Sequence, residues 1–166
     1  MKTLYLIRHA KSSWSIDGIE DRDRPLKGRG IRDAHLVSQY LREESINADY
    51  FSMCSSPATR ALHTALIFAK NLSVPASKVA IDDELYHSSA EEILAVVRKT
   101  SDMCDAAMYF AHNPGITDFV NEMTSASVRN VPTTGVVIVR FDCQRWEDIG
   151  PGADLIQFEY PKRLKK

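Results

Sequence analysis

Cysteine is scarce in this chain of 166 residues: only Cys54, Cys104 and Cys143 occur, and no CxxC spacing is present. Three cysteines cannot all pair within one chain, so the pattern is typical of free thiols in a reducing compartment. The chain also lacks an apolar run near the roughly 20 residues that a membrane-spanning helix needs. Its N-terminal apolar run is short and ends at Arg8, unlike a signal peptide. We therefore expect a cytoplasmic protein without membrane association.

Net charge is also nearly absent. The 21 lysines and arginines are offset by 22 acidic residues, which leaves a formal charge of −1. This balance argues against a general nucleic-acid or membrane-surface binder. The hydrophobic content of 44% and charged content of 26% are ordinary for a globular protein. The length favours a single domain over residues 1–166.

Motifs for the common cofactors are missing. Neither GxxxxGK[ST] nor GxGxxG occurs, which argues against a P-loop or a dinucleotide fold. The sequence has no HExxH motif and no paired His/Asp cluster that would indicate a metal site. His35 and His63 lie within expected helices without ligand spacing, and we interpret them as surface or packing histidines. We expect neither a metal nor an organic cofactor.

The pattern that is present alternates short apolar runs with helical periodicity. We expect strands at 4–7, 50–54, 79–81, 106–111, 135–141 and 155–160, and helices at 29–43, 57–70, 90–98 and 116–123. A polar loop over residues 12–27 and a solvated tail at 162–166 complete the chain. Alternation of this kind predicts an α/β three-layer sandwich, with a mostly parallel central sheet flanked by helices.

Three of the expected strands end in side chains that can bind an anion. Arg8 and His9 follow the first strand, Arg60 opens the helix after the second, and His112 follows the strand at 106–111. Ligands gather beyond the carboxyl ends of such strands, so two guanidiniums and two imidazoles converge if the strands are neighbours. His9 and His112 could also be metal ligands, but the two arginines would repel a cation.

The surroundings of Arg60 strengthen the case for an anion. Ser56 suits the N-cap of the helix and Pro57 suits its first position. Arg60 then lies in the opening turn, beside unsatisfied N–H groups and the positive end of the helix dipole. Such a place attracts phosphate, sulfate or carboxylate.

These residues carry a family resemblance. The segments 6–14 (LIRHAKSSW), 55–65 (SSPATRALHTA) and 111–115 (AHNPG) resemble, in order, three blocks of the histidine phosphatase superfamily. Residues 23–26 (DRPL) and 29–30 (RG) resemble its small SixA-like branch, whose known members act on phosphohistidine. The resemblance implies a phosphoglycerate-mutase-like fold. Ala10 replaces the glycine most common after the catalytic histidine, and Ser15 stands where mutase-like members usually have asparagine.

The resemblance and the residues together favour a cofactor-independent phosphatase. Neutral His9 would attack phosphorus and form a phosphohistidine intermediate, which water then hydrolyses. Arg8 and Arg60 would bind the equatorial oxygens of the phosphoryl group. The negative field of this group would protonate His112, which would act as a third donor. His9 would keep a free lone pair by donating its other N–H to a backbone carbonyl.

Further residues are candidates for the substrate side of the site. Arg24 is either a phosphate contact or a loop arginine paired with Asp21 or Asp23. Lys11 and Ser12 follow the nucleophile and either contact phosphate or lie in a solvated loop. We interpret the nearby Trp14 as a packing residue.

The proton donor to the leaving group is the least settled role. Mutase-like relatives have a glutamate in a pattern resembling Leu-x-Glu after the third strand. The matching stretch here is residues 84–87 (ELYH), which puts His87 at that place. His87 is therefore either a proton donor or an exposed loop residue.

Two other functional classes stay open. One is a small-molecule phosphomonoesterase or a phosphoglycerate-mutase-like phosphotransferase, and the other is a non-catalytic module that binds a phospho-ligand. Only about ten residues separate the second helix from the next strand, which leaves little lid to enclose a small metabolite. We therefore favour a phosphorylated protein, carrying phosphohistidine, over a small phosphate ester as partner; the oligomeric state is left open.

Overall fold

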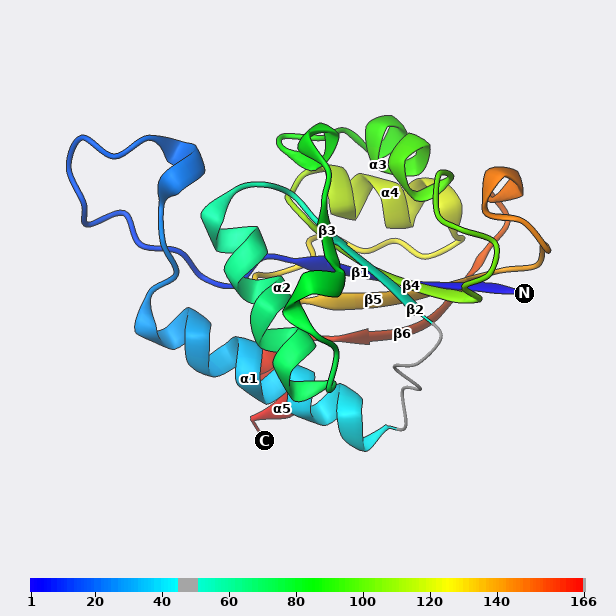
Figure 1. Ribbon diagram of the computed structural model, residues 1–166. Coiled ribbons are helices and arrows are strands. Elements are labelled where there is room, and N and C mark those ends of the chain that lie inside the picture. Colours follow the sequence, from blue (N-terminus) through cyan, green and yellow to red (C-terminus); the bar gives the residue numbers. More distant parts are fainter. Residues whose placement is uncertain (45–50, 166) are drawn as a thin grey trace.

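The structure is a computed structural model that describes residues 1–44 and 51–165. Its helices and strands alternate along the chain (Figure 1). In order they are β1 (Lys2–Arg8), α1 (Gly28–Glu43), β2 (Phe51–Ser55), α2 (Thr59–Asn71), β3 (Val79–Ile81), α3 (Ala90–Val97), β4 (Ala106–Ala111), α4 (Gly115–Met123), β5 (Val136–Phe141), β6 (Asp154–Glu159) and α5 (Pro161–Leu164). Within the described ranges, no helix is both long and apolar enough to cross a membrane.

The strands form one six-stranded sheet in the order β3-β2-β4-β1-β5-β6. Parallel pairing joins β3 to β2, β2 to β4 and β4 to β1. β5 runs antiparallel to both of its neighbours, β1 and β6. Parallel neighbours need crossover connections, and the helices between the strands supply them. The predicted mostly parallel sheet is confirmed.

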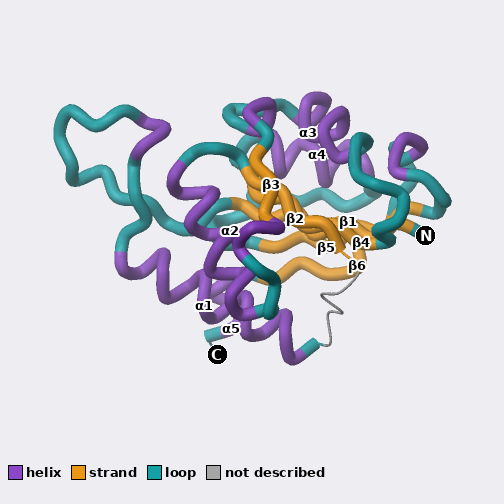
Figure 2. The backbone as a smooth tube through the Cα atoms, viewed as in Figure 1, coloured by secondary structure: helices purple, strands orange, loops and turns teal. Residues whose placement is uncertain are grey.

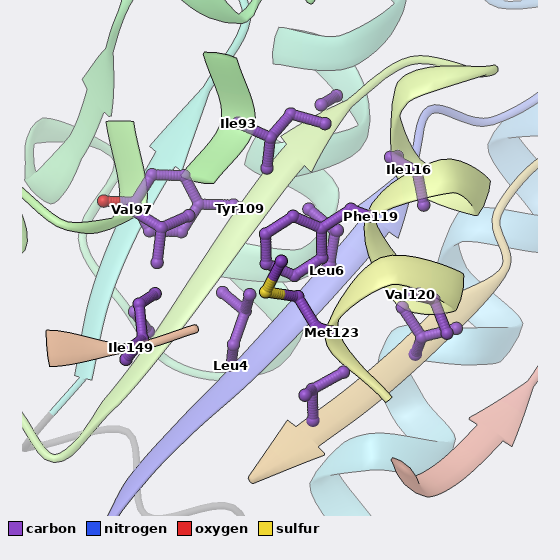
Figure 3. Close-up of a cluster of buried hydrophobic side chains, with 14 of the residues drawn as sticks. Leu4, Leu6, Ile93, Val97, Tyr109, Ile116, Phe119, Val120, Met123 and Ile149 are labelled. Atoms are coloured by element: carbon purple, nitrogen blue, oxygen red, sulfur yellow. The ribbon is translucent and has the colours of Figure 1, made fainter. Parts of the chain in front are cut away.

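Helices cover both faces of the sheet (Figure 2). Side chains alternate between the two faces of a strand, so Leu4 and Leu6 of β1 pack toward α3 and α4 while Ile7 packs toward α1 and α2. Figure 3 shows the first cluster, in which Phe119 of α4 and Ile93 of α3 lie over the sheet. The three-layer α/β architecture is therefore confirmed.

Two local expectations need correction. The second helix begins at Thr59 rather than at Pro57, because the chain is still extended at Ala58. The C-terminal tail is not wholly a solvated end: residues 161–164 form α5, and Lys165 Nζ lies 2.7 Å from the buried carboxylate of Asp33. A buried carboxylate needs a partner, and this ion pair holds the tail against α1. Lys166 lies outside the described residues.

The carboxyl ends of the three central strands lie level with one another. In the register of the sheet, Arg8 of β1 pairs with Ala111 of β4, and Ser55 of β2 pairs with Phe110. The alignment continues one residue beyond β1, since the N–H of His9 donates to the carbonyl of Ala111 over 3.2 Å. The predicted convergence of three strand ends is confirmed.

Candidate active site

A pocket of about 350 Å³ opens at this edge of the sheet. It is lined by Arg8, His9, Lys11, Ser12, Trp14, Arg24, Lys27, Arg60, His87, His112, Asn113 and Thr133. All eight site residues expected from the sequence are therefore in one place. Among the described residues that line it, five are lysines or arginines and none is a carboxylate. Such a lining concentrates positive potential and selects an anionic ligand.

His9 is buried at the base of this pocket, with 8% of its surface exposed. Its Nδ1 lies 2.8 Å from the carbonyl oxygen of Ala10. Because a carbonyl can only accept, Nδ1 carries the proton and Nε2 keeps its lone pair. Burial, with the nearby guanidiniums of Arg60 and Arg8, lowers the pKa of His9 to about 4. His9 is thus a neutral imidazole whose Nε2 can act as a nucleophile.

The backbone after His9 is fixed by a residue that the sequence analysis missed. Thr64 Oγ1 accepts the N–H of Ala10 over 2.9 Å and donates to the carbonyl of Arg60 over 2.7 Å. This single hydroxyl ties the nucleophile loop to the first turn of α2. On the other side of this loop, Gly30 of α1 packs directly against the backbone of Lys11. A Cβ at Gly30 would lie 2.2 Å from the carbonyl oxygen of Lys11. Only a glycine allows α1 to approach that closely.

His112 lies beside His9, with ring centroids 5.2 Å apart. Its Nε2 hydrogen-bonds Ser56 Oγ at 2.8 Å, so Ser56 supports the imidazole rather than capping α2. Burial, and then the charges of His9 and Arg60, lowers the pKa of His112 to about 3. His112 is therefore neutral in the free protein. The protonated state expected from the sequence requires the negative charge of a bound ligand.

Arg8 and Arg60 enter the pocket from β1 and α2. Arg8 Nη1 donates to the carbonyl of Val131 over 3.0 Å, which fixes the guanidinium. Among the described residues, the buried nitrogens Arg8 Nε, Arg60 Nε and His112 Nδ1 have no hydrogen-bond partner. Buried polar groups are rarely left unpaired, so three in one site indicate a ligand that accepts hydrogen bonds.

Asp21 links the loop over residues 12–27 to the site. Its carboxylate accepts from Arg24 Nε at 3.1 Å, Arg60 Nη2 at 3.1 Å and the Tyr86 hydroxyl at 2.6 Å, and its carbonyl accepts from Arg60 Nη1 at 2.7 Å. Burial alone would raise the pKa of Asp21, but the hydrogen bonds from Tyr86 and Arg60 hold it well below its ordinary value. Asp21 is an anchor for both arginines. From the sequence, Asp21 was expected only as a partner for Arg24.

His87 lies at the mouth of the pocket on the connection between β3 and α3. Its side chain is 64% exposed, and its Nε2 is 3.6 Å from Asp21 Oδ2. Its ring centroid lies 6.1 Å from that of His112. The connection can lie this close because Gly115 has no side chain. A Cβ at this position would lie only 2.1 Å from the carbonyl oxygen of Ser88. His87 is thus exposed and also part of the site.

Arg24 combines the two alternatives drawn from the sequence. It lines the pocket, and it also pairs with Asp21. Its Nη1 donates to Ser12 Oγ at 2.8 Å, which draws Ser12 into the buried wall. The interpretation of Trp14 as a packing residue is wrong. Its surface is 77% exposed, and its ring stacks on the Arg24 guanidinium. Lys11 also lines the pocket.

The three cysteines are free, as the sequence indicated. Within residues 1–44 and 51–165, no group of three or more His, Cys, Asp or Glu side chains is arranged to hold a metal ion. The pocket lining instead brings together three arginines, two lysines and three histidines.

Comparison with known proteins gives the family. A model of the histidine phosphatase superfamily (branch 1) matches residues 4–95. An uncharacterised protein of Mycobacterium tuberculosis is 29% identical, over 94% of this chain and the whole of that protein. An uncharacterised chloroplastic protein of Arabidopsis thaliana is 28% identical, over 91% of this chain and 73% of its own length.

Solved structures show the same fold. A protein from Agrobacterium tumefaciens, assigned as a phosphohistidine phosphatase SixA, has a TM-score of 0.80 at 23% identity, covering 96% of this chain and 98% of its own. The protein histidine phosphatase SixA in complex with tungstate also scores 0.80, at 18% identity, covering 98% and 99%. These matches show that the chain shares its fold with SixA proteins. With the family-model match over residues 4–95, the chain belongs to the histidine phosphatase superfamily, and its fold is SixA-like.

Proposed function

We propose that residues 1–166 form one domain that acts as a cofactor-independent phosphatase, through a phosphohistidine intermediate on His9. We propose further that its substrate is phosphohistidine on a protein. The observation that carries the proposal is the set of buried, unpaired nitrogens of Arg8, Arg60 and His112 in the same pocket as a neutral His9. A phosphoryl group offers these donors three oxygens at once.

The reaction needs two displacements at phosphorus. The Nε2 lone pair of His9 forms a bond to phosphorus while the bond to the leaving group breaks. Water then attacks the phosphorus of phosphorylated His9, so that a P–O bond forms, the P–N bond breaks, and inorganic phosphate is released from the imidazole. Arg8, Arg60 and a protonated His112 stabilise the negative charge on the equatorial oxygens in both steps. These donors supply the charge that a metal ion provides in other phosphatases.

The leaving group favours phosphohistidine over a phosphate ester. Protonated phosphohistidine departs as neutral imidazole, whereas an ester departs as an alkoxide that needs a strong proton donor. The proton donor suggested for this site, His87, is largely exposed and only a fair acid for an alkoxide. The connection between α2 and β3 is short, so little chain is available to enclose a small metabolite. An open pocket suits a phosphoryl group that is attached to a protein.

The test compares three substrates in the presence of EDTA: a histidine-phosphorylated protein, p-nitrophenyl phosphate and glycerol phosphate. We expect the phosphoprotein to have the highest kcat/KM, no effect of the chelator, and inhibition by vanadate. Arg8→Ala and Arg60→Ala should each lower kcat/KM by roughly 10². A preference for glycerol phosphate would favour a small-molecule phosphomonoesterase. Transfer of phosphate between sugar hydroxyls would favour a mutase. Binding without turnover would indicate a phospho-ligand module.

A further inference from the structure

Trp14 is exposed in a way that its own packing does not explain. It is one of the lining residues of the pocket, yet 77% of its surface is open to solvent. Tryptophan is usually well buried, since its large apolar surface is the main source of its stabilisation. An exposed indole at the rim of a binding pocket therefore indicates a contact surface for a ligand.

The indole is also held by a rigid support. The Cζ atom of Arg24 lies 3.4 Å from the centroid of the Trp14 ring. Arg24 itself is only 6% exposed, and three hydrogen bonds fix it: Nε to Asp21 Oδ1, and Nη1 to Ser12 Oγ and to the carbonyl of Ser13. Stacking on a fixed guanidinium sets the orientation of the ring before any ligand arrives.

We propose that Trp14 is a stacking platform for a planar ring that carries the phosphoryl group, and that Arg24 is the positioning residue that holds the platform. The inference deepens the proposed function, because the imidazole of a phosphohistidine is such a ring. With the phosphoryl group bound by Arg8 and Arg60, the attached ring extends toward the exposed part of the pocket lining, which includes Trp14. Flat aromatic surfaces stack face to face or in offset geometry, and alkyl groups gain less from such a surface.

This assignment changes the role of Arg24. An arginine that contacted only phosphate would act equally on every phosphate ligand. An arginine that supports an indole acts on the ring instead, so its loss should change the selectivity for ring-bearing ligands. The arginine's Nε and Nη1 are already engaged by Asp21, Ser12 and Ser13, which favours the supporting role.

The first test measures binding without turnover. Calorimetric titrations compare phenylphosphonate, methylphosphonate and inorganic phosphate on the wild type, Trp14→Ala and Trp14→Phe. We expect Trp14→Ala to weaken phenylphosphonate roughly 5- to 10-fold, the scale of one lost ring stack, with the other two affinities unchanged and Phe restoring most of the loss. Ile16→Ala is the matched control, because Ile16 is exposed on the same loop but does not line the pocket.

Equal affinity of the wild type for the two phosphonates would overturn the platform. An equal loss of affinity for all three ligands in Trp14→Ala would also overturn the proposal, since it would mean that the phosphate-binding residues had changed. Arg24→Gln should reproduce the selective loss of phenylphosphonate. These titrations use no substrate turnover. A Trp14-dependent preference in a protein that hydrolyses nothing would therefore contradict the proposed catalysis and leave the platform in place.

The second test follows turnover. KM for phosphoimidazole should rise roughly 5- to 10-fold in Trp14→Ala, while KM for glycerol phosphate and kcat for both stay near the wild-type values. A fall of kcat on both substrates, with KM unchanged, would mean that Trp14 acts on the chemistry and would overturn the proposal.

Discussion

The rings of His9 and His112 lie side by side in the site, with centroids 5.2 Å apart and both rings buried. Burial next to arginines keeps each imidazole neutral, with pKa values of about 4 and about 3. Their hydrogen bonds differ, because His9 is fixed by the carbonyl of Ala10 and His112 by the hydroxyl of Ser56. This difference separates a nucleophile of fixed tautomer from an imidazole that can take up a proton.

The first prediction concerns stability against pH. An unfolded histidine titrates near pH 6.5, so below that pH the unfolded chain binds protons that the folded chain excludes. The free energy of unfolding should therefore fall as the pH drops from 6.5 toward 4, by about 2 kcal/mol per histidine between pH 7 and 5. Urea denaturation of the wild type and His112→Gln checks this.

His112→Gln should lose about half as much stability as the wild type over that range, while the two should run parallel between pH 7 and 9. Equal losses between pH 7 and 5 would mean that His112 is not held neutral in the folded protein.

The second prediction concerns the proton on His112. A bound dianion adds negative charge beside a neutral imidazole and should raise its pKa, so that binding takes up a proton. Tungstate carries no proton near neutral pH, so the uptake belongs to the protein. Calorimetric titration in buffers of different ionisation enthalpy measures it directly. We expect net uptake by the wild type at pH 6 and much less by His112→Gln; no uptake by either would remove His112 as an ionised donor.

The third prediction tests Asp21 as the anchor of the arginines. Asp21→Asn removes the charge that orients Arg60 and should lower kcat roughly tenfold, through misplacement of this phosphate donor. Tungstate binding should not weaken, because the pocket becomes more positive. Asp23→Asn is the matched control, an exposed carboxylate two residues along the same loop. Parallel losses of binding and kcat in Asp21→Asn would mean that the pocket had collapsed.

The fourth prediction concerns His87. If it protonates the leaving group, His87→Ala should slow hydrolysis of alkyl phosphate esters far more than that of phosphohistidine, whose imidazole departs easily. Steady-state kinetics on both substrates give the ratio. Equal losses would indicate a phosphate contact, and no loss on either substrate would return His87 to an exposed loop residue.

The sequence predicted the parts of the site that follow from strand ends. Arg8, His9 and His112 come directly after apolar runs, and parallel strands deliver such residues to one edge whatever the details of packing. Asp21 and Thr64 could not be found this way, since their roles depend on how an irregular loop and one face of α2 meet the nucleophile. The four-residue spacing of Arg60 and Thr64 on a helix was the available signal.

Trp14 shows a different limit of sequence reasoning. A tryptophan in a polar loop is compatible with packing or with exposure, and only the position of Arg24 decides between them. The protonation of His112 could not be read from the sequence either, because it depends on burial and on whether an anion is present. In the first case the deciding interaction lies within one irregular loop, and in the second it involves a ligand.

His9 Nε2 is the atom that we propose receives the phosphoryl group. The decisive measurement is rapid quenching of the protein with phosphorus-labelled substrate, followed by acid and base treatment and peptide mapping. We predict a label that is acid-labile, base-stable and located on His9, and its absence from a folded His9→Ala protein without turnover. Full activity of His9→Ala, or a label on another residue, would contradict the mechanism.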